Sequence, residues 1–93
     1  MKFAYLIMGE FDSRQDRAEI HEGAAQIIGV SNLGEACLQA QRLVEEGVNV
    51  IELCGAFGEE GARMIIEATG CRVPVGFVGH LQEQALLFEQ LFG

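Results

Sequence analysis

Cysteine and basic residues are both scarce in this sequence of 93 residues, and each scarcity excludes a class of protein. The three cysteines are an odd number and are scattered without any close pair, so neither a disulfide framework nor a zinc site is indicated. Only 6 lysines and arginines stand against 14 aspartates and glutamates, and the formal charge of −8 repels phosphates and anionic lipid heads. We therefore expect no nucleic-acid partner, no membrane partner, no metal and no cofactor.

Long apolar runs are also missing. No segment approaches the roughly 20 apolar residues of a membrane span. The first residues, MKFAYLIMGEF, contain one lysine and an apolar run that is too short for a signal peptide. Together with the unpaired cysteines, these absences predict a reduced protein of the cytoplasm.

Apolar residues are abundant, at 49% of the chain, which is typical of a globular protein. The length predicts a single α/β domain over residues 1–93, with a small core, since short chains bury a smaller share of their surface. A partner copy would cover surplus apolar surface, so we expect a homo-oligomer.

Apolar segments of strand length alternate with helical patterns. Four segments are predicted strands: 2–9, 24–31, 48–55 and 73–80. Residues 10–23 between the first two are polar and charged, and they are predicted to form a loop. We expect that this loop can fold over the edge of the sheet, bringing Asp12, Arg14 and Arg17 with it.

Three helices are predicted at residues 32–47, 59–69 and 81–93 from apolar side chains at helical spacing. Asn32 and Glu35 resemble a capping box at the start of the first helix, and Gly47 and Gly70 can end the first two. The apolar stripe of the last helix is wide for one that covers a sheet face. This helix is therefore predicted either to be deeply buried or to contact another subunit.

The predicted order is strand, loop, strand, helix, strand, helix, strand, helix. Strands that alternate with helices run parallel and are joined by right-handed crossovers. The sequence therefore predicts an α/β fold with a four-stranded, mostly parallel sheet and three helices. The direction of the first strand stays open because its loop is long.

Ligands of open α/β sheets bind beyond the carboxyl ends of the strands, where loops and helix N-termini converge. Applied to this sequence, the rule gives one set of candidate ligand-binding residues: Ser31, Glu52, Cys54, Gly55, Phe57, Gly58 and His80.

Each candidate also has a structural interpretation. Glu52 can accept a hydrogen bond from a ligand or act as a base, but a glutamate at a strand end also commonly reaches solvent. Cys54 is a nucleophile only if its pKa is lowered, and such cysteines are more often small core residues. His80 can be an acid or base, or can cap the last helix. Phe57 can line a pocket or fill the core.

Gly55, Gly58 and Gly61 form a GxxGxxG pattern that is neither a dinucleotide nor a P-loop signature. Such a turn offers backbone N–H groups to an anion, but Glu59 and Glu60 would oppose a phosphate there. Turn geometry is therefore the stronger interpretation of these glycines.

The segments IELCGAFG and VPVG, after a strand that ends in IGVSN and a loop that contains DSRQDRAEI, resemble a small bacterial family of short proteins known only as a domain of unknown function. The resemblance implies one compact α/β domain and no particular activity.

Three hypotheses for the function follow. The leading one is a small domain that binds a small polar metabolite at the carboxyl edge of the sheet. The second is an isomerase or lyase that uses Glu52, Cys54 and His80. The third is an assembly or scaffold module without catalysis. Whether the protein is an enzyme is not decided by the sequence.

Overall fold

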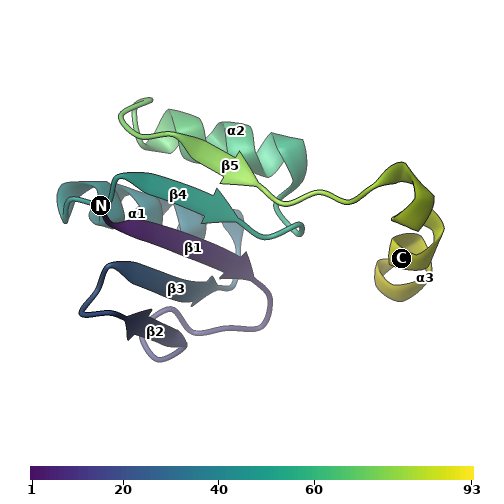
Figure 1. Ribbon diagram of the computed structural model, residues 1–93, viewed down its shortest axis with the longest axis horizontal. Coiled ribbons are helices and arrows are strands. Elements are labelled where there is room, and N and C mark those ends of the chain that lie inside the picture. Colours follow the sequence, from purple (N-terminus) through teal and green to yellow (C-terminus); the bar gives the residue numbers. More distant parts are fainter.

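The computed structural model describes residues 1–93 and arranges them as a five-stranded sheet with two helices packed on it and a third helix beyond its edge (Figure 1). The strands are β1 (Phe3–Met8), β2 (Arg17–Ile20), β3 (Ala25–Val30), β4 (Val50–Leu53) and β5 (Val75–Phe77). The helices are α1 (Leu33–Glu45), α2 (Gly58–Ala68), the 3-10 turn η1 (Gln82–Gln84) and α3 (Ala85–Phe92).

The strand order in the sheet is β2-β3-β1-β4-β5. β1 runs parallel to both of its neighbours, β3 and β4, and β4 runs parallel to β5. The predicted α/β fold with a mostly parallel sheet is thus confirmed. The structure also gives the direction of β1, which the sequence had left open.

The sheet has one more strand than predicted, because β2 lies inside the stretch predicted as a loop. β2 pairs with β3 in antiparallel direction, and all four of its residues are exposed. The residues of β2 alternate between polar and apolar, but over only four positions inside a polar stretch, so periodicity alone is a weak signal for this strand. Its turn is formed by His21, Glu22 and Gly23, all with positive φ.

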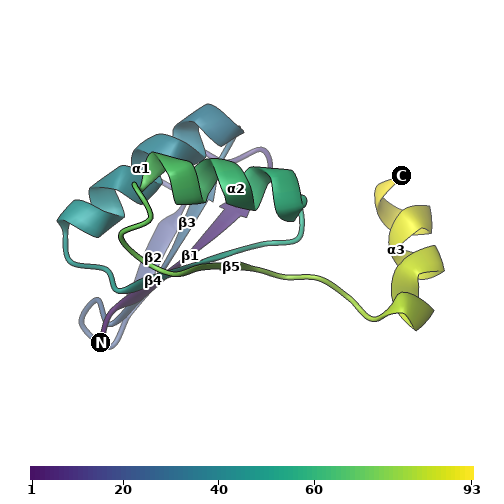
Figure 2. The same cartoon turned by 90° about the horizontal axis from the view of Figure 1, so that it is seen from above.

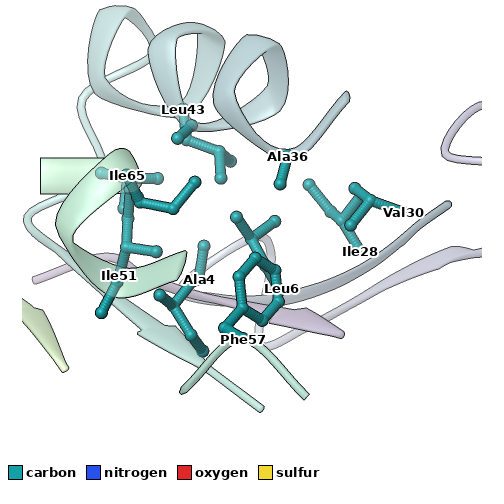
Figure 3. Packing of buried hydrophobic residues seen from close by; sticks show 13 residues of the cluster. Ala4, Leu6, Ile28, Val30, Ala36, Leu43, Ile51, Phe57 and Ile65 are labelled. Carbon is teal, nitrogen blue, oxygen red and sulfur yellow. The ribbon is translucent and has the colours of Figure 1, made fainter. Parts of the chain in front are cut away.

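The core lies between the sheet and the two helices α1 and α2 (Figure 3). Leu6, Ile28 and Ile51 project from the strands toward the helices, and Leu43 and Ile65 project from α1 and α2. All five are 0–1% exposed. At about 1.5–3 kcal/mol for each large apolar side chain, this layer supplies the main stabilisation of the fold.

The predicted helix ends agree with the structure. The side chain of Asn32 accepts a hydrogen bond of 2.8 Å from the backbone N–H of Glu35 and so caps α1. Gly47 and Gly70 follow α1 and α2 with φ of +93° and +65°, conformations that glycine adopts without strain.

Helices cover only one face of the sheet. Figure 2 shows α1 and α2 on the same side of the sheet. This is expected because the crossover from β3 through α1 to β4 and the crossover from β4 through α2 to β5 both run toward the β5 edge with the same hand. The opposite face carries Phe3 and Tyr5 of β1 and Ile27 of β3, and Phe3 and Ile27 are 36% and 42% exposed. No helix in the structure is both long enough and apolar enough to span a bilayer.

The helix α3 stands apart from the rest of the molecule (Figures 1 and 2). It contributes no buried residue, although six of its eight side chains are apolar. The segment predicted as a single helix over 81–93 is a 3-10 turn followed by α3. The longest dimension of the molecule, 39 Å, is horizontal in Figure 1, where α3 occupies one end.

Candidate functional site

A polar hollow of about 430 Å³ lies at the carboxyl ends of β1 and β3. The loop after β1 forms one wall, Ser31 at the end of β3 contributes to the rim, and α1 forms the other wall. The lining residues are Phe11, Asp12, Ser13, Arg14, Ser31, Glu35, Gln39 and Arg42. The hollow thus occupies the edge where sites of α/β sheets are expected.

Phe11 anchors the loop on the sheet. A Cβ atom at Gly29 would lie 2.6 Å from Cγ and 2.7 Å from Cβ of Phe11, so the aromatic ring occupies the space that the glycine leaves open. Close approach of this kind is a role that only glycine can fill. The chain beyond Phe11 is therefore held over the carboxyl edge, as the sequence had suggested for this charged loop.

Ser13 connects the loop to α1. It is only 6% exposed, and its hydroxyl donates a hydrogen bond to Oε1 of Glu35. Nε2 of Gln39 donates to the same Oε1 at 3.2 Å and to Oγ of Ser13 at 3.4 Å. Glu35 and Gln39 are four residues apart and lie on one side of the helix. The three side chains form the floor of the hollow.

The hydrogen bonds on Glu35 change its acidity. Ser13, and then Gln39, donate to the carboxylate and lower the pKa of Glu35 below its ordinary value. The hydrogen bonds therefore stabilise the ionised form of Glu35 at neutral pH. They also reduce its affinity for a proton, so Glu35 is a weak general base.

On the rim, Asp12 is satisfied by its own loop. The backbone N–H of Arg14 donates to Oδ1 at 3.0 Å and its Nε donates to the same atom at 3.3 Å. The backbone bond, followed by the side-chain bond, lowers the pKa of Asp12. The pairing in turn raises the pKa of the Arg14 guanidinium.

Arg42, in the last turn of α1, is exposed at the rim and forms no hydrogen bond or ion pair through its guanidinium. Ser31 accepts a hydrogen bond of 3.3 Å from the amide of Asn32, which leaves its own hydroxyl proton free. The hollow thus has uncommitted donors on Arg42 and Ser31 and one uncommitted acceptor, Oε2 of Glu35.

Of the seven residues predicted to bind ligand, only Ser31 lines this hollow. Glu52 is half-buried on the uncovered face, where a Cβ at Gly76 would lie 2.6 Å from its Oε2. Sγ of Cys54 accepts a hydrogen bond of 3.4 Å from the backbone N–H of Met8. A ligand role for Glu52 and Cys54 stays a prediction.

The remaining predicted residues have mainly structural surroundings. Phe57 is 5% exposed and belongs to the core. Gly58 begins α2 with φ of +63°, and a Cβ at Gly55 would lie 3.6 Å from the backbone oxygen of Val78. His80 stacks on Phe88 of α3 at 4.1 Å between ring centroids and caps no helix.

His80 forms no hydrogen bond with Glu52 or Cys54, and it lies with α3 rather than with the hollow. A joint catalytic role of these three side chains stays a prediction. No cluster of three or more histidine, cysteine, aspartate and glutamate side chains is placed to hold a metal ion.

The sequence analysis missed Ser13, Glu35, Gln39 and Arg42 as site residues. One signal was present: Glu35, Gln39 and Arg42 recur at helical spacing, and Gln39 interrupts an apolar stripe between Ala36 and Leu43. A polar side chain within a buried stripe needs a partner, which Ser13 and Glu35 supply.

A family model described as "Family of unknown function (DUF6506)" matches residues 1–93. The chain belongs to DUF6506. This agrees with the resemblance to a small domain of unknown function. No curated protein and no solved structure matches this DUF6506 chain, so the comparisons assign it no activity.

Proposed function

We propose that this protein binds a small polar metabolite with a carboxylate or phosphate group in the hollow at the carboxyl edge of the sheet. The observation that carries the proposal is the unpaired guanidinium of Arg42 at the rim of a polar hollow of about 430 Å³. A small metabolite fits this volume, which is within the usual range for ligand pockets of about 300–1,000 Å³.

The chemistry of the ligand follows from which groups are already bonded. Asp12 is paired with Arg14, and Oε1 of Glu35 accepts hydrogen bonds from Ser13 and Gln39, while Oε2 of Glu35 accepts none. Arg42 retains all of its N–H groups. Guanidinium groups bind carboxylates and phosphates through paired, charge-assisted hydrogen bonds. The free hydroxyl proton of Ser31 can add a further bond.

The test is a thermal-shift screen of small carboxylates and phosphates against wild type, Arg42→Gln and Arg63→Gln. Arg63 is a matched control, because it is also an exposed helical arginine but pairs with Glu59 on α2 at 2.8 Å. A ligand at about ten times its Kd stabilises by about 1.4 kcal/mol. In a domain of this size, that raises Tm by about 6–11 °C.

We expect at least one compound to raise the Tm of wild type and Arg63→Gln but not that of Arg42→Gln. A panel without any shift, or equal shifts in both variants, would contradict the proposed site.

We further propose that the chain acts as a homo-oligomer in a reducing compartment such as the cytoplasm. The first part is supported by α3, which is rich in apolar residues and buries none of them. A short helix that is apolar on most sides needs a packing partner to be stable in water. The second part is supported by the three cysteines, all of which are free.

A further inference from the structure

Two apolar surfaces of this chain are largely uncovered, apart from the stacking of His80 on Phe88. The first is a stripe on α3 made of Leu87, Phe88, Leu91 and Phe92, which are 41–77% exposed. The second is a hollow of about 230 Å³ on the uncovered sheet face, lined by residues of β1, β2 and β3: Phe3, Tyr5, Ala18, Ile20, Ala25, Gln26 and Ile27.

We propose that α3 of one copy docks on the uncovered sheet face of a second copy, and that α3 of the second copy docks in the same way on the sheet face of the first. This inference rests on the proposed homo-oligomer and specifies its interface. The result is a two-fold symmetric dimer in which each sheet has helices on both faces, as largely parallel sheets require.

The two surfaces match in size and chemistry. An α-helix of eight residues is about 12 Å long, and the three strands under the hollow span about 10 Å between the outer two. Neither the stripe nor the lining of the hollow contains a charged side chain. In a chain with a formal charge of −8, a contact confined to the stripe and the lining contains no acidic group, although Glu52 of β4 lies beside Tyr5 on the same face.

A second copy fits better than the chain's own α3. The backbone N–H of Val78 still pairs with the oxygen of Leu53, so only Gly79–Leu81 are free before η1. Three residues span at most about 10 Å. The strands that line the hollow, β1 to β2, lie two to four places from β5, which is about 10–19 Å across the sheet.

To reach its own hollow, α3 would also have to reverse direction and cross β4 over the carboxylate of Glu52, which lies on this face. Instead, the segment before α3 continues beyond the carboxyl edge and carries α3 away from its own sheet (Figure 2). Reciprocal docking places two helices on two sheet faces. Two such contacts together can approach the roughly 1,200–2,000 Å² that stable interfaces bury.

The experiment is sedimentation of wild type and three variants. The helix variant Leu87→Glu/Leu91→Glu and the face variant Ile27→Glu each put charge into the proposed interface. The control variant Leu86→Glu changes α3 on the side that it shares with Glu89 and Gln90. We expect wild type and the control to have twice the chain mass of 10.1 kDa.

The helix variant and the face variant should each dissociate at least about 100-fold more readily than wild type, since an unpaired charge in an interface is strongly unfavourable. Far-UV circular dichroism checks that each variant is folded. Ile20→Glu, at a position that is 69% exposed, replaces Ile27→Glu if the latter does not fold.

Mixing the helix variant with the face variant decides whether helices are exchanged. The face variant supplies an intact α3 and the helix variant supplies an intact sheet face, so the mixed pair keeps one intact contact where each variant alone keeps none. The mixture should therefore dimerise more readily than either variant alone, and a mixture that associates no more readily overturns the exchange.

The remaining outcomes separate the two proposals. Wild type that stays monomeric at about 1 mM overturns both the homo-oligomer and the exchange, because a Kd above this value corresponds to an interaction weaker than about 4 kcal/mol. A wild-type dimer that neither variant weakens overturns the exchange alone. A dimer lost in the helix variant but kept in the face variant overturns docking on this sheet face.

Discussion

The contact between Phe11 and Gly29 holds the loop over the candidate site, and replacing the glycine by alanine tests it. The backbone of Gly29 does not lie in the left-handed region, so alanine is allowed by φ. Its Cβ, however, would lie 2.7 Å from Cβ of Phe11 and 2.6 Å from Cγ. Because these atoms lie close to the backbone of Phe11, a side-chain rotation alone cannot clear the clash.

The matched control is Gly76→Ala on the same face of the sheet. Its Cβ would also approach an atom to 2.6 Å, but that atom is Oε2 of Glu52, at the far end of a flexible side chain. Rotation of the carboxylate relieves the contact. The two substitutions therefore introduce the same group at the same nominal distance and differ only in what must move.

The expected energies differ accordingly. Overpacking against a fixed group costs about 1–3 kcal/mol, and loss of chain entropy in the unfolded state returns about 0.4–1 kcal/mol for a glycine-to-alanine change. We expect Gly29→Ala to lower the free energy of unfolding by about 1–2 kcal/mol. Gly76→Ala should change it by less than about 0.5 kcal/mol.

Urea unfolding followed by circular dichroism measures both values. With a slope of about 1 kcal/mol/M, Gly29→Ala should lower the midpoint by about 1–2 M. In a Phe11→Gly background neither Cβ nor Cγ of residue 11 is present, so the clash disappears and adding Gly29→Ala should be neutral or stabilising. An equal effect of Gly29→Ala in both backgrounds, or equal effects at Gly29 and Gly76, would refute the contact.

Two further predictions concern the core and the floor of the site. Leu6→Ala should cost about 2–5 kcal/mol of unfolding free energy, because Leu6 is fully buried, whereas Leu86→Ala, at 65% exposure, should cost less than about 0.5 kcal/mol; comparable losses would contradict the described core. Ser13→Ala removes the first hydrogen bond that lowers the pKa of Glu35. Because the pKa of Glu35 is lower in the folded than in the unfolded state, the ionised carboxylate contributes to the free energy of unfolding at pH values above the ordinary glutamate pKa of about 4.3. This contribution is lost as the pH falls below that value. The urea midpoints of wild type and Ser13→Ala should therefore differ near neutral pH and converge in acid, and a gap that is independent of pH would contradict this account.

Much of the fold was predictable because it depends on sequence patterns within single helices and turns. The stripes of α1 and α2, the cap at Asn32 and the positive-φ glycines Gly47 and Gly70 are all short-range features. β2 was missed because its alternation of polar and apolar residues covers only four positions and its residues are all exposed. The position of α3 relative to the sheet is a tertiary property that helical periodicity does not contain.

Only one of the seven predicted site residues, Ser31, lines the candidate hollow, and it followed from the rule for strand ends. The predicted residues 52–58 follow a different strand, β4, and their role stays a prediction. Gln39 and Arg42 lie two to three turns into α1, so the hollow extends along the side of this helix, which the rule for strand ends does not describe. The surroundings of Glu52 could not be predicted from the sequence, because they depend on which face of the sheet the helices leave uncovered.

The most direct test of the account is native mass spectrometry of wild type and Arg42→Gln after gentle purification. The account predicts that wild type retains one small acidic molecule per chain, on an assembly of two chains, and that Arg42→Gln loses the molecule but keeps the assembly. Wild type without a retained molecule, or Arg42→Gln with the same molecule at the same stoichiometry, would contradict the proposed site.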